Sequence, residues 1–288
     1  MPSEIIQWFP GHMAKTRRMI TENVKNVDVI IEILDARIPK SSRNPEISTL
    51  TAAKPTILLL NKATLADPAM TKKWCDYYSS KNTVCITTDC ISGMGINKIS
   101  GAVASVLEEK IKRYEEKGMI GRKLKAMIVG IPNVGKSSLI NKICGTKKAK
   151  VENRPGVTLN KQWVSTNIGL DLMDMPGVLW PKFDDRITGE NLALTGAIKD
   201  ATLDLESLAT VLCKRLRSLY PDLLAQRYKL GDMSKYDELS DYELFEVIGR
   251  KRGFLVSGGE INTERTANML LEEFRSAKIG NITLDTFD

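Results

Sequence analysis

The sequence contains no apolar run long enough to cross a lipid bilayer. Its longest runs, for example Ile57–Leu60, have the length of a buried strand, whereas a membrane-spanning helix needs about 20 apolar residues. The first residues, Met1–Glu4, are not a basic segment that leads into an apolar one, so we expect no secretory signal. Both absences predict a cytoplasmic protein without a membrane partner.

Cysteine is sparse and histidine is scarcer still. The chain has 5 cysteines, an odd number, with no Cys-x-x-Cys pair. This pattern argues against a disulfide framework and against a zinc site, and it favours reduced thiols. His12 is the only histidine in the chain. Any mechanism that needs an imidazole therefore has a single candidate.

The remaining composition is that of an ordinary soluble protein. The chain has 288 residues, of which 42% are hydrophobic and 27% are charged, and it is long enough for two domains. In residues 1–200, short apolar runs alternate with helical patterns, which predicts a mainly parallel sheet with helices on both faces. The predicted strands are residues 27–34, 56–60, 84–87, 126–129 and 170–173, and the predicted helices are residues 44–53, 68–80, 96–116 and 136–143.

Beyond residue 200 the strand pattern disappears. Apolar residues recur there at helical spacing, and glycine-containing loops separate the three groups. The groups are Leu203, Leu208, Val211, Leu212 and Leu216; Leu244, Val247 and Ile248; and Ala267, Leu270, Leu271 and Phe274. The sequence therefore predicts an α/β domain over residues 1–200 and a small all-α domain over residues 201–288.

Residues Gly130–Ser137 fit the phosphate-binding pattern G-x-x-x-x-G-K-[ST], between a predicted strand and a predicted helix. The glycines let the backbone curl so that its N–H groups face phosphates, and the helix N-terminus adds positive potential. We expect Lys136 to reach the β- and γ-phosphates and Ser137 to bind Mg²⁺. The nucleotide-binding residues expected in this loop are Asn133, Val134, Gly135, Lys136, Ser137 and Ser138.

Two further elements follow in the order that a P-loop nucleotidase needs. Asp174–Gly177 is a D-x-x-G pattern at the end of a predicted strand. Asp174 is expected to hold Mg²⁺ through water, and the Gly177 N–H is expected to sense the γ-phosphate. Between the two motifs, Thr158 lies in a predicted loop, placed to close on Mg²⁺ when a triphosphate is bound.

The guanine-recognition pattern N-K-x-D, which normally follows the phosphate loop, precedes it here. Asn61–Thr64 ends one predicted strand, and the loop after the next strand begins at Asp89 and Cys90. The expected base-binding residues are therefore Asn61, Lys62, Ala63, Thr64, Asp89 and Cys90. This order predicts a circularly permuted P-loop GTPase fold in which residues 96–125 join the original ends.

Thr64 stands where the pattern has aspartate. An aspartate carboxylate accepts two hydrogen bonds from guanine, so its loss should cost several kcal/mol of discrimination, judging from charge-assisted bonds (about 1.5–3 kcal/mol each). Asp67, three residues later, could not take the same position without rearrangement. The sequence leaves open whether guanine selectivity is weakened.

The basic residues are unevenly distributed. Residues 1–200 contain 30 Lys and Arg against 20 Asp and Glu, whereas residues 201–288 contain 12 against 15. The densest clusters are Lys110–Lys125 and Lys142–Lys161, and such clusters favour polyanions such as RNA. A solvated helix face would explain the first cluster equally well. It explains the second less easily, because that cluster adjoins the phosphate loop.

Taken together, the motifs resemble the ribosome biogenesis GTPase A family, along essentially the whole chain. The resemblance rests on the permuted order and on the Trp-Phe-Pro-Gly-His-Met segment within residues 7–13, Asp35–Pro39, Asn61-Lys62, Gly130–Ser138, Asp174–Gly177 and the tail around Gly258–Phe274. It implies a bacterial GTPase that joins late precursors of the large ribosomal subunit, binds ribosomal RNA and leaves after hydrolysis. It also implies slow hydrolysis that the ribosomal particle stimulates.

The resemblance extends to the ions and to the tail. Asn133 matches an asparagine that helps to hold K⁺ beside the phosphates in related potassium-stimulated GTPases, although in this sequence alone it could equally be a turn residue. The helical residues 201–288 are expected to bind RNA or the ribosome. We expect GTP or GDP as the nucleotide, Mg²⁺ as the cofactor and a monomeric protein.

The catalytic water lacks its usual partner. The residue after D-x-x-G is often a glutamine that orients water, but here it is Val178, which is aliphatic. His12, in a turn that opens a basic helix, could orient or deprotonate water once the particle presses it into place. It could equally cap the turn or contact RNA. The catalytic candidates are therefore His12, Lys136 and Thr158.

Three hypotheses remain open from the sequence. The first is the ribosome-assembly GTPase, and the second is a GTPase of another RNA pathway, for which no dedicated chemistry site is visible. The third is an RNA chaperone that binds nucleotide but rarely hydrolyses it, which Val178 and Thr64 favour. Because Asp174–Gly177 leads through Glu190–Ile198 into the C-terminal helices, we also hypothesise that the γ-phosphate biases their orientation.

Overall fold

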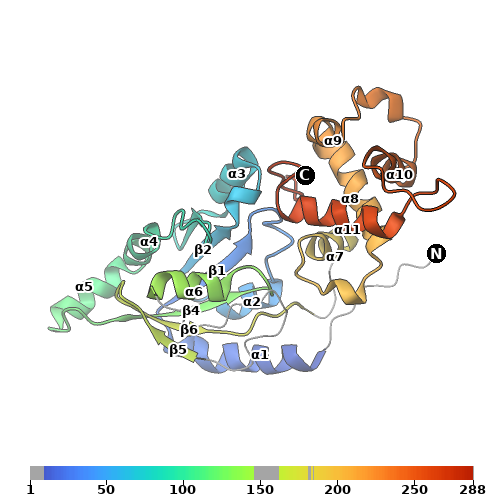
Figure 1. Cartoon of the computed structure of the whole chain (residues 1–288). Coiled ribbons are helices and arrows are strands. Elements are labelled where there is room, and N and C mark those ends of the chain that lie inside the picture. Colours follow the sequence, from blue (N-terminus) through green and yellow to red (C-terminus); the bar gives the residue numbers. More distant parts are fainter. Residues whose placement is uncertain (1–9, 146–161, 181–182, 184, 288) are drawn as a thin grey trace.

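The computed structural model describes residues 10–145, 162–180, 183 and 185–287, apart from the side chains of residues 10–13 and 162. In Figure 1 the sheet and its covering helices lie together, and the orange and red helices of the C-terminal half gather beside them. Within the described part of the chain, no helix combines the length and the apolar character that crossing a membrane requires.

Six strands form one sheet in the order β3-β2-β1-β4-β6-β5. All neighbouring pairs are parallel except β5 and β6, which are antiparallel. The strands are β1 (Val29–Asp35), β2 (Thr56–Asn61), β3 (Thr83–Thr87), β4 (Leu124–Gly130), β5 (Gln162–Ser165) and β6 (Leu170–Asp174). The predicted mainly parallel sheet is confirmed, and β5 is an edge strand that the sequence did not predict.

The strand order confirms the permutation. The phosphate loop follows β4, which lies between β1 and β6. Strands β1, β2 and β3 precede the loop in the sequence but extend the sheet on one side of β4, where the last strands of an unpermuted GTPase would lie. Helices α4 (Lys98–Val106) and α5 (Glu108–Glu116) then carry the chain from β3, at one edge, back to β4.

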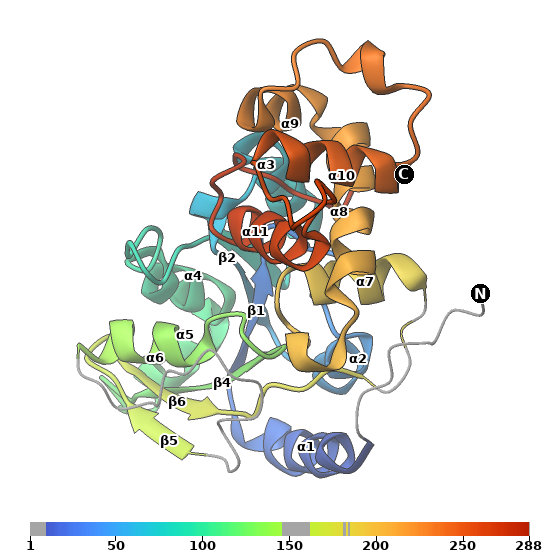
Figure 2. The ribbon, with the colours of Figure 1, turned by 45° about the vertical axis from the view of Figure 1, so that its right-hand side comes forward.

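Helices cover both faces of the sheet. In Figures 1 and 2, α4 and α6 (Lys136–Cys144) lie on one face, and α1 (Pro10–Asn23) and α2 (Pro45–Thr51) lie on the other. This two-sided cover explains why β1 is buried along its whole length, as parallel strands in such folds usually are. The remaining helices are α1 (Pro10–Asn23), α2 (Pro45–Thr51), α3 (Pro68–Tyr78), α6 (Lys136–Cys144), α7 (Arg186–Leu194), α8 (Leu205–Leu219), α9 (Pro221–Tyr228), α10 (Asp241–Lys251) and α11 (Thr263–Arg275).

Glu32 places a carboxylate in the middle of buried strand β1. Its side chain is 3% exposed, and Oε2 lies 3.5 Å from Nε of Arg43. Burial raises the pKa of Glu32 to about 7, and the positive charge of Arg43 opposes this shift only in part. The group therefore titrates near neutral pH in the folded protein.

The C-terminal helices and the sheet share one hydrophobic core. Leu212 of α8 and Phe274 of α11 belong to the same buried cluster as Ile31 of β1. Helix α7 lies before residue 200 in the sequence, yet it packs beside α8 (Figure 2). The three apolar groups that predicted helices beyond residue 200 fall on α8, α10 and α11, except Leu203, which precedes α8. Helices α7 and α9 were not predicted.

The last described residues return to the first strands. Backbone N–H groups of Ile282 and Leu284 donate to the carbonyls of Leu65 and Arg37, at 3.2 and 2.7 Å. The Asp285 carboxylate accepts from both the N–H and the hydroxyl of Ser41, at 2.7 and 2.6 Å. This tail therefore ties the helical part to loops at the carboxyl ends of β1 and β2.

Candidate nucleotide-binding site

The phosphate loop joins the end of β4 to the start of α6. Three of its residues have a positive φ: Gly130 (152°), Asn133 (57°) and Gly135 (108°). A Cβ at Gly135 would collide with the side-chain amide of Asn61, and one at Gly130 would lie 2.6 Å from the carbonyl of Ile33. Glycine is therefore required at both positions by conformation and by space.

Lys136 begins α6 and points back into the loop. Its Nζ donates to the carbonyls of Gly130 and Ile131, at 3.0 and 2.9 Å. Burial lowers the pKa of Lys136 to about 8, although the negative charge of Asp174 acts in the opposite direction. The backbone of Gly177 approaches so closely that a Cβ there would collide with Nζ. The structure thus brings Lys136, Asp174 and Gly177 together.

Asp174 offers a buried carboxylate oxygen without a partner. It ends β6, its side chain is buried, and Oδ1 has no hydrogen-bond partner among the described residues. Burial raises its pKa, and the charge of Lys136 opposes the shift. Ser137 and Ser138 are half-buried in the first turn of α6. A free carboxylate oxygen beside a loop of this kind suits a hydrated Mg²⁺, so these residues fit the expected ion.

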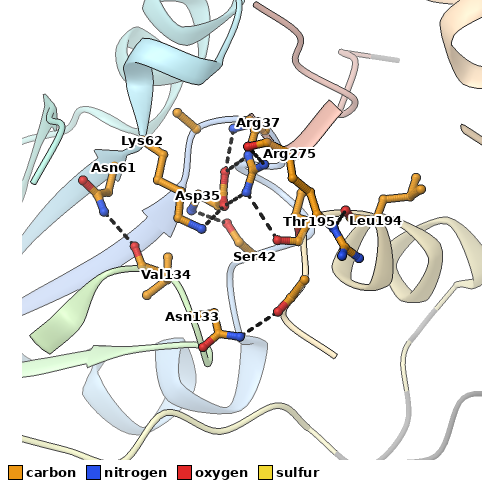
Figure 3. Close-up of polar contacts among 12 residues, drawn as sticks. Asp35, Arg37, Ser42, Asn61, Lys62, Asn133, Val134, Leu194, Thr195 and Arg275 are labelled. Carbon is orange, nitrogen blue, oxygen red and sulfur yellow. Dashed lines mark hydrogen bonds and ion pairs between the residues drawn. The ribbon is translucent and has the colours of Figure 1, made fainter. Parts of the chain in front are cut away.

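Asn61 joins the displaced base motif to the phosphate loop. Its Nδ2 donates to the carbonyl of Val134 at 2.7 Å (Figure 3). Its Oδ1 accepts from the N–H of Cys90 at 3.0 Å. Ala63, two residues on, is buried and donates its N–H to the carbonyl of Thr88 at 3.1 Å. The motif after β2, the loop after β3 and the phosphate loop therefore meet at one place.

Lys62 has a left-handed backbone (φ 60°) and forms an ion pair with Asp35. Its Nζ lies 2.9 Å from Asp35 Oδ2, and the Arg37 guanidinium contacts both carboxylate oxygens, at 2.9 and 2.7 Å (Figure 3). Burial alone would raise the pKa of Asp35, but Arg37 and Lys62 outweigh it and hold that pKa well below its usual range. Sequence reasoning assigned no role to the buried ion pair between Asp35 and Arg37. The signal was the Asp35-Ala-Arg37 sequence directly after an apolar strand.

Thr64 and Asp89 are in direct contact. The Thr64 hydroxyl donates a hydrogen bond to Asp89 Oδ2. Asp89 Oδ1 accepts from the N–H groups of Ile91 and Ser92, at 2.7 and 3.1 Å, which fixes the loop after β3. Asp67 is engaged elsewhere: its carboxylate caps α3 and accepts from the Tyr220 hydroxyl at 3.2 Å.

The end of α7 is held by side chains from three other elements (Figure 3). Asn133 of the phosphate loop donates to the carbonyl of Gly196 at 2.8 Å, and Arg37 donates to that of Thr195 at 3.4 Å. Arg275 of α11 donates to the carbonyls of Leu194 and Ala193, at 2.9 and 3.0 Å. These bonds satisfy carbonyl groups that the helix leaves free at its end. Nothing in the local sequence around Arg275 or Gly196 indicated this arrangement.

Two expected site residues lie outside what the structure describes. They are Thr158 and the side chain of His12, and the basic residues Lys147 to Arg154 fall in the same category. Helix α1 begins at Pro10, so the backbone of His12 belongs to the first turn of the helix and not to a turn ahead of it. Val178 is buried, and its carbonyl accepts from the Asn44 amide at 3.4 Å.

Comparisons with known proteins agree with this geometry. Residues 125–224 match the model of the family described as 50S ribosome-binding GTPase. The chain is 46% identical over 281 residues to ribosome biogenesis GTPase A of Priestia megaterium, covering 97% of this chain and 96% of the other. It is 44% identical to the protein of the same name from Bacillus cereus, over 98% and 94% of the two chains.

The fold has a solved counterpart. The crystal structure of GNP-bound YlqF from Thermotoga maritima matches with a TM-score of 0.62 at 25% identity, covering 94% of this chain and 97% of the other. A GDP-bound YlqF structure matches with a TM-score of 0.64 at 26% identity, covering 93% and 98%. This protein belongs to the ribosome biogenesis GTPase A family, as the permuted sheet, the phosphate loop and relatives at 44–46% identity over nearly the whole chain show.

Proposed function

We propose that this protein hydrolyses GTP to GDP and phosphate while it assists assembly of the large ribosomal subunit, and that hydrolysis releases it from the precursor particle. The observation that carries the nucleotide site is the double hydrogen bond of Asn61, which joins the phosphate loop at Val134 to the loop after β3 at Cys90. The ribosomal role is supported by the names of relatives that match nearly the whole chain.

The residues then have separate roles in nucleotide binding. Lys136 would contact the β- and γ-phosphates, and Asn133–Ser138 would surround them with backbone N–H groups. Ser137, Asp174 and Thr158 would hold Mg²⁺, which when bound offsets phosphate charge. Gly177 would donate its N–H to the γ-phosphate, because its backbone lies against Lys136. Asn61, Lys62, Ala63, Thr64, Asp89 and Cys90 would surround the base.

Val178 cannot orient the attacking water, because the valine side chain is apolar and buried. Another residue must therefore do so. His12 would fill this role from the first turn of α1 when the ribosomal particle fixes the helix. Asn133 would help to hold K⁺ beside the phosphates, so turnover should be faster in KCl than in NaCl.

Two surfaces support the proposed ribosomal RNA contact. Lys15, Arg17 and Arg18 are exposed and add positive charge to α1, where Arg18 pairs with Glu22. The helical unit over residues 201–288 would supply a second contact, and it carries exposed apolar side chains at Leu255 and Val256. The protein would act as a monomer in the cytoplasm.

The test is steady-state hydrolysis of GTP and ATP in KCl, with and without purified large ribosomal subunits. GTP-selective turnover that rises many-fold with subunits is the expected result, and Lys136→Ala should abolish it. Lys73→Ala is the matched control, because Lys73 is exposed on α3, outside the phosphate loop and the basic clusters. Nucleotide binding without turnover under all conditions would instead support the RNA-chaperone hypothesis.

A further inference from the structure

The chain lacks the carboxylate of N-K-x-D at residue 64, but a carboxylate lies within hydrogen-bond distance of that position. Asp89 follows β3, and Thr64 follows β2, which pairs with β3 in parallel. The register pairs Leu60 with Thr87, so the residues after both strands emerge at the same edge of the sheet. There the Thr64 hydroxyl donates to Asp89 Oδ2.

Both partners are held in place by other parts of the chain. Asp89 is buried, and its Oδ1 accepts two backbone N–H groups, from Ile91 and Ser92. The backbone around Thr64 is fixed from the tail, because Asn281 Nδ2 donates to the carbonyls of Thr64 and Ala66, at 2.7 and 3.1 Å. The pair is therefore positioned before any ligand arrives.

Asp89 is ionised at neutral pH. Burial acts to raise its pKa, but the hydrogen bonds from Thr64, Ser92 and Ile91 and the charge of Lys142 outweigh burial and lower the pKa below the ordinary value. The Thr64 hydroxyl has one proton, and it points to Asp89. The remaining lone pairs of Thr64 Oγ1 and Asp89 Oδ2 therefore present two neighbouring acceptors.

Two neighbouring acceptors match the edge of guanine. Guanine presents two donors there, N1–H and the 2-amino group, whereas adenine presents an acceptor at N1. A free threonine hydroxyl could donate to adenine N1, but one committed to Asp89 cannot. The contact thus favours guanine in two ways: it supplies a charged acceptor, and it prevents Thr64 from acting as a donor.

We propose that Asp89 is the specificity-determining residue for guanine in this protein, and that the threonine and aspartate have exchanged places relative to N-K-x-D, with Thr64 as the second acceptor. This inference rests on the proposed function, since it assigns the base end of the same site. Asp67 is not the substitute, because its carboxylate caps α3 and meets Tyr220.

The decisive variant is Asp89→Asn. Asparagine keeps an oxygen for the N–H groups of Ile91 and Ser92, but it replaces the charged Oδ2 with an amide donor. Equilibrium dissociation constants for GDP, XDP and ADP would be measured with the full chain and Mg²⁺ by isothermal titration calorimetry. GDP affinity should fall about 10- to 100-fold, as expected for loss of a charge-assisted bond. XDP affinity should rise, because xanthine carries an oxygen in place of the 2-amino group.

Three further variants complete the experiment. Asp67→Asn is the matched control and should leave all three affinities unchanged, since asparagine also caps helices well. Asp89→Ser should lose the preference for GDP over ADP, and it decides the question if Asp89→Asn does not fold. The exchange variant Thr64→Asp/Asp89→Ser should regain that preference. Unchanged guanine preference in Asp89→Ser would overturn the inference.

The failure of the inference can be told apart from that of the proposed function. If the parent protein prefers GDP to ADP but Asp89→Asn keeps the same GDP and XDP affinities, the Asp89 assignment is wrong and the GTPase stands. If the parent protein binds neither GDP nor GTP, the proposed function is wrong and the inference falls with it.

Discussion

Asn133 of the phosphate loop donates a 2.8 Å hydrogen bond to the carbonyl of Gly196, just beyond the end of α7. The bond joins a residue expected to lie beside phosphate and K⁺ to the segment that leads into the C-terminal helices. Arg37 and Arg275 hold the preceding carbonyls of the same helix end. We hypothesised that the γ-phosphate biases the orientation of the C-terminal helices. The bond between Asn133 and Gly196 would connect the two physically.

Replacing Asn133 with glycine should loosen the end of α7. Glycine accepts the positive φ of residue 133, so the loop backbone is preserved while the donor to Gly196 is lost. Amide hydrogen exchange should become faster at Gly196 and Ala197, which donate to Ala193 and Leu192 within this helix end. We expect a local loss of about 1 kcal/mol.

The control for this change is Asn268→Ala, which removes an exposed side-chain hydrogen bond within α11. It should leave exchange near residue 196 unchanged. Equal protection of Gly196 and Ala197 in Asn133→Gly and in the parent protein would show that the bond does not restrain α7.

Arg275→Lys should destabilise the folded protein although it preserves the charge. The arginine spans the carbonyls of Leu194 and Ala193 and also pairs with Asp200, at 2.7 and 2.8 Å, a geometry that lysine cannot reproduce. Because the side chain is 24% exposed, part of the effect is screened by solvent. We expect a loss of about 1–3 kcal/mol in urea-induced unfolding. Arg250→Lys, at an exposed position of α10, should change stability by less than about 0.5 kcal/mol.

Glu32 should make the protein less stable as pH rises from about 4.5 to somewhat above 7, beyond which the effect levels off. Its pKa is about 7 when folded and 4.5 ordinarily, so between these values the folded state binds more protons than the unfolded state. Glu32→Gln should therefore increase the free energy of unfolding at pH 8 by up to about 3 kcal/mol. The gain should shrink as pH is lowered from 8 to 6.

The measurement is urea-induced unfolding of both proteins across that pH range. Glu116→Gln serves as the control, because Glu116 is exposed at the end of α5. A stability difference between Glu32→Gln and the parent that does not change with pH would contradict the assigned pKa.

Nucleotide binding should take up a proton at Lys136. Its pKa is about 8 in the ligand-free protein, and nearby phosphates would raise that pKa. At pH 8 about half of the Lys136 side chains are neutral, so Mg²⁺-GDP binding should take up about half a proton there and much less at pH 7. Affinity should accordingly weaken as pH rises above 8.

Calorimetric titrations at pH 8 in buffers with different ionisation enthalpies measure this uptake directly. Lys73→Ala should show the same uptake as the parent protein, because Lys73 is exposed on α3 and lies outside the phosphate loop. The absence of proton uptake at pH 8 would show that Lys136 is already charged before the nucleotide binds.

The sequence predicted those elements whose signal is local. Buried parallel strands such as β1 and β2 are near-continuous apolar runs, and the phosphate loop has a fixed pattern of glycine and lysine. Strand β5 was not predicted, because it has only four residues and lies at the edge of the sheet. Thr64 was recognised as a departure, but its contact with Asp89 depends on the register between β2 and β3. That register is a tertiary property, so the local sequence does not show it.

The hydrogen bonds that hold the end of α7 were not predicted, for the same reason. Its donors, Arg37, Asn133 and Arg275, come from distant positions in the chain, and their partners are backbone carbonyls, which leave no mark in a sequence. The proposed roles of His12 and Thr158 stay predictions, because the relevant atoms lie outside the described residues.

Residues 281–285 form hydrogen bonds to Arg37, Ser41 and Leu65, and these contacts can form only late in synthesis. The loops after β1 and β2 leave the translating ribosome early, yet the tail that pairs with them is made more than 200 residues later. A nascent chain must therefore keep this edge of the base-binding site uncovered until residues 281–285 have been made. Premature termination before residue 281 would leave Thr64 without its Asn281 support, so incomplete products would carry a poorly formed guanine site.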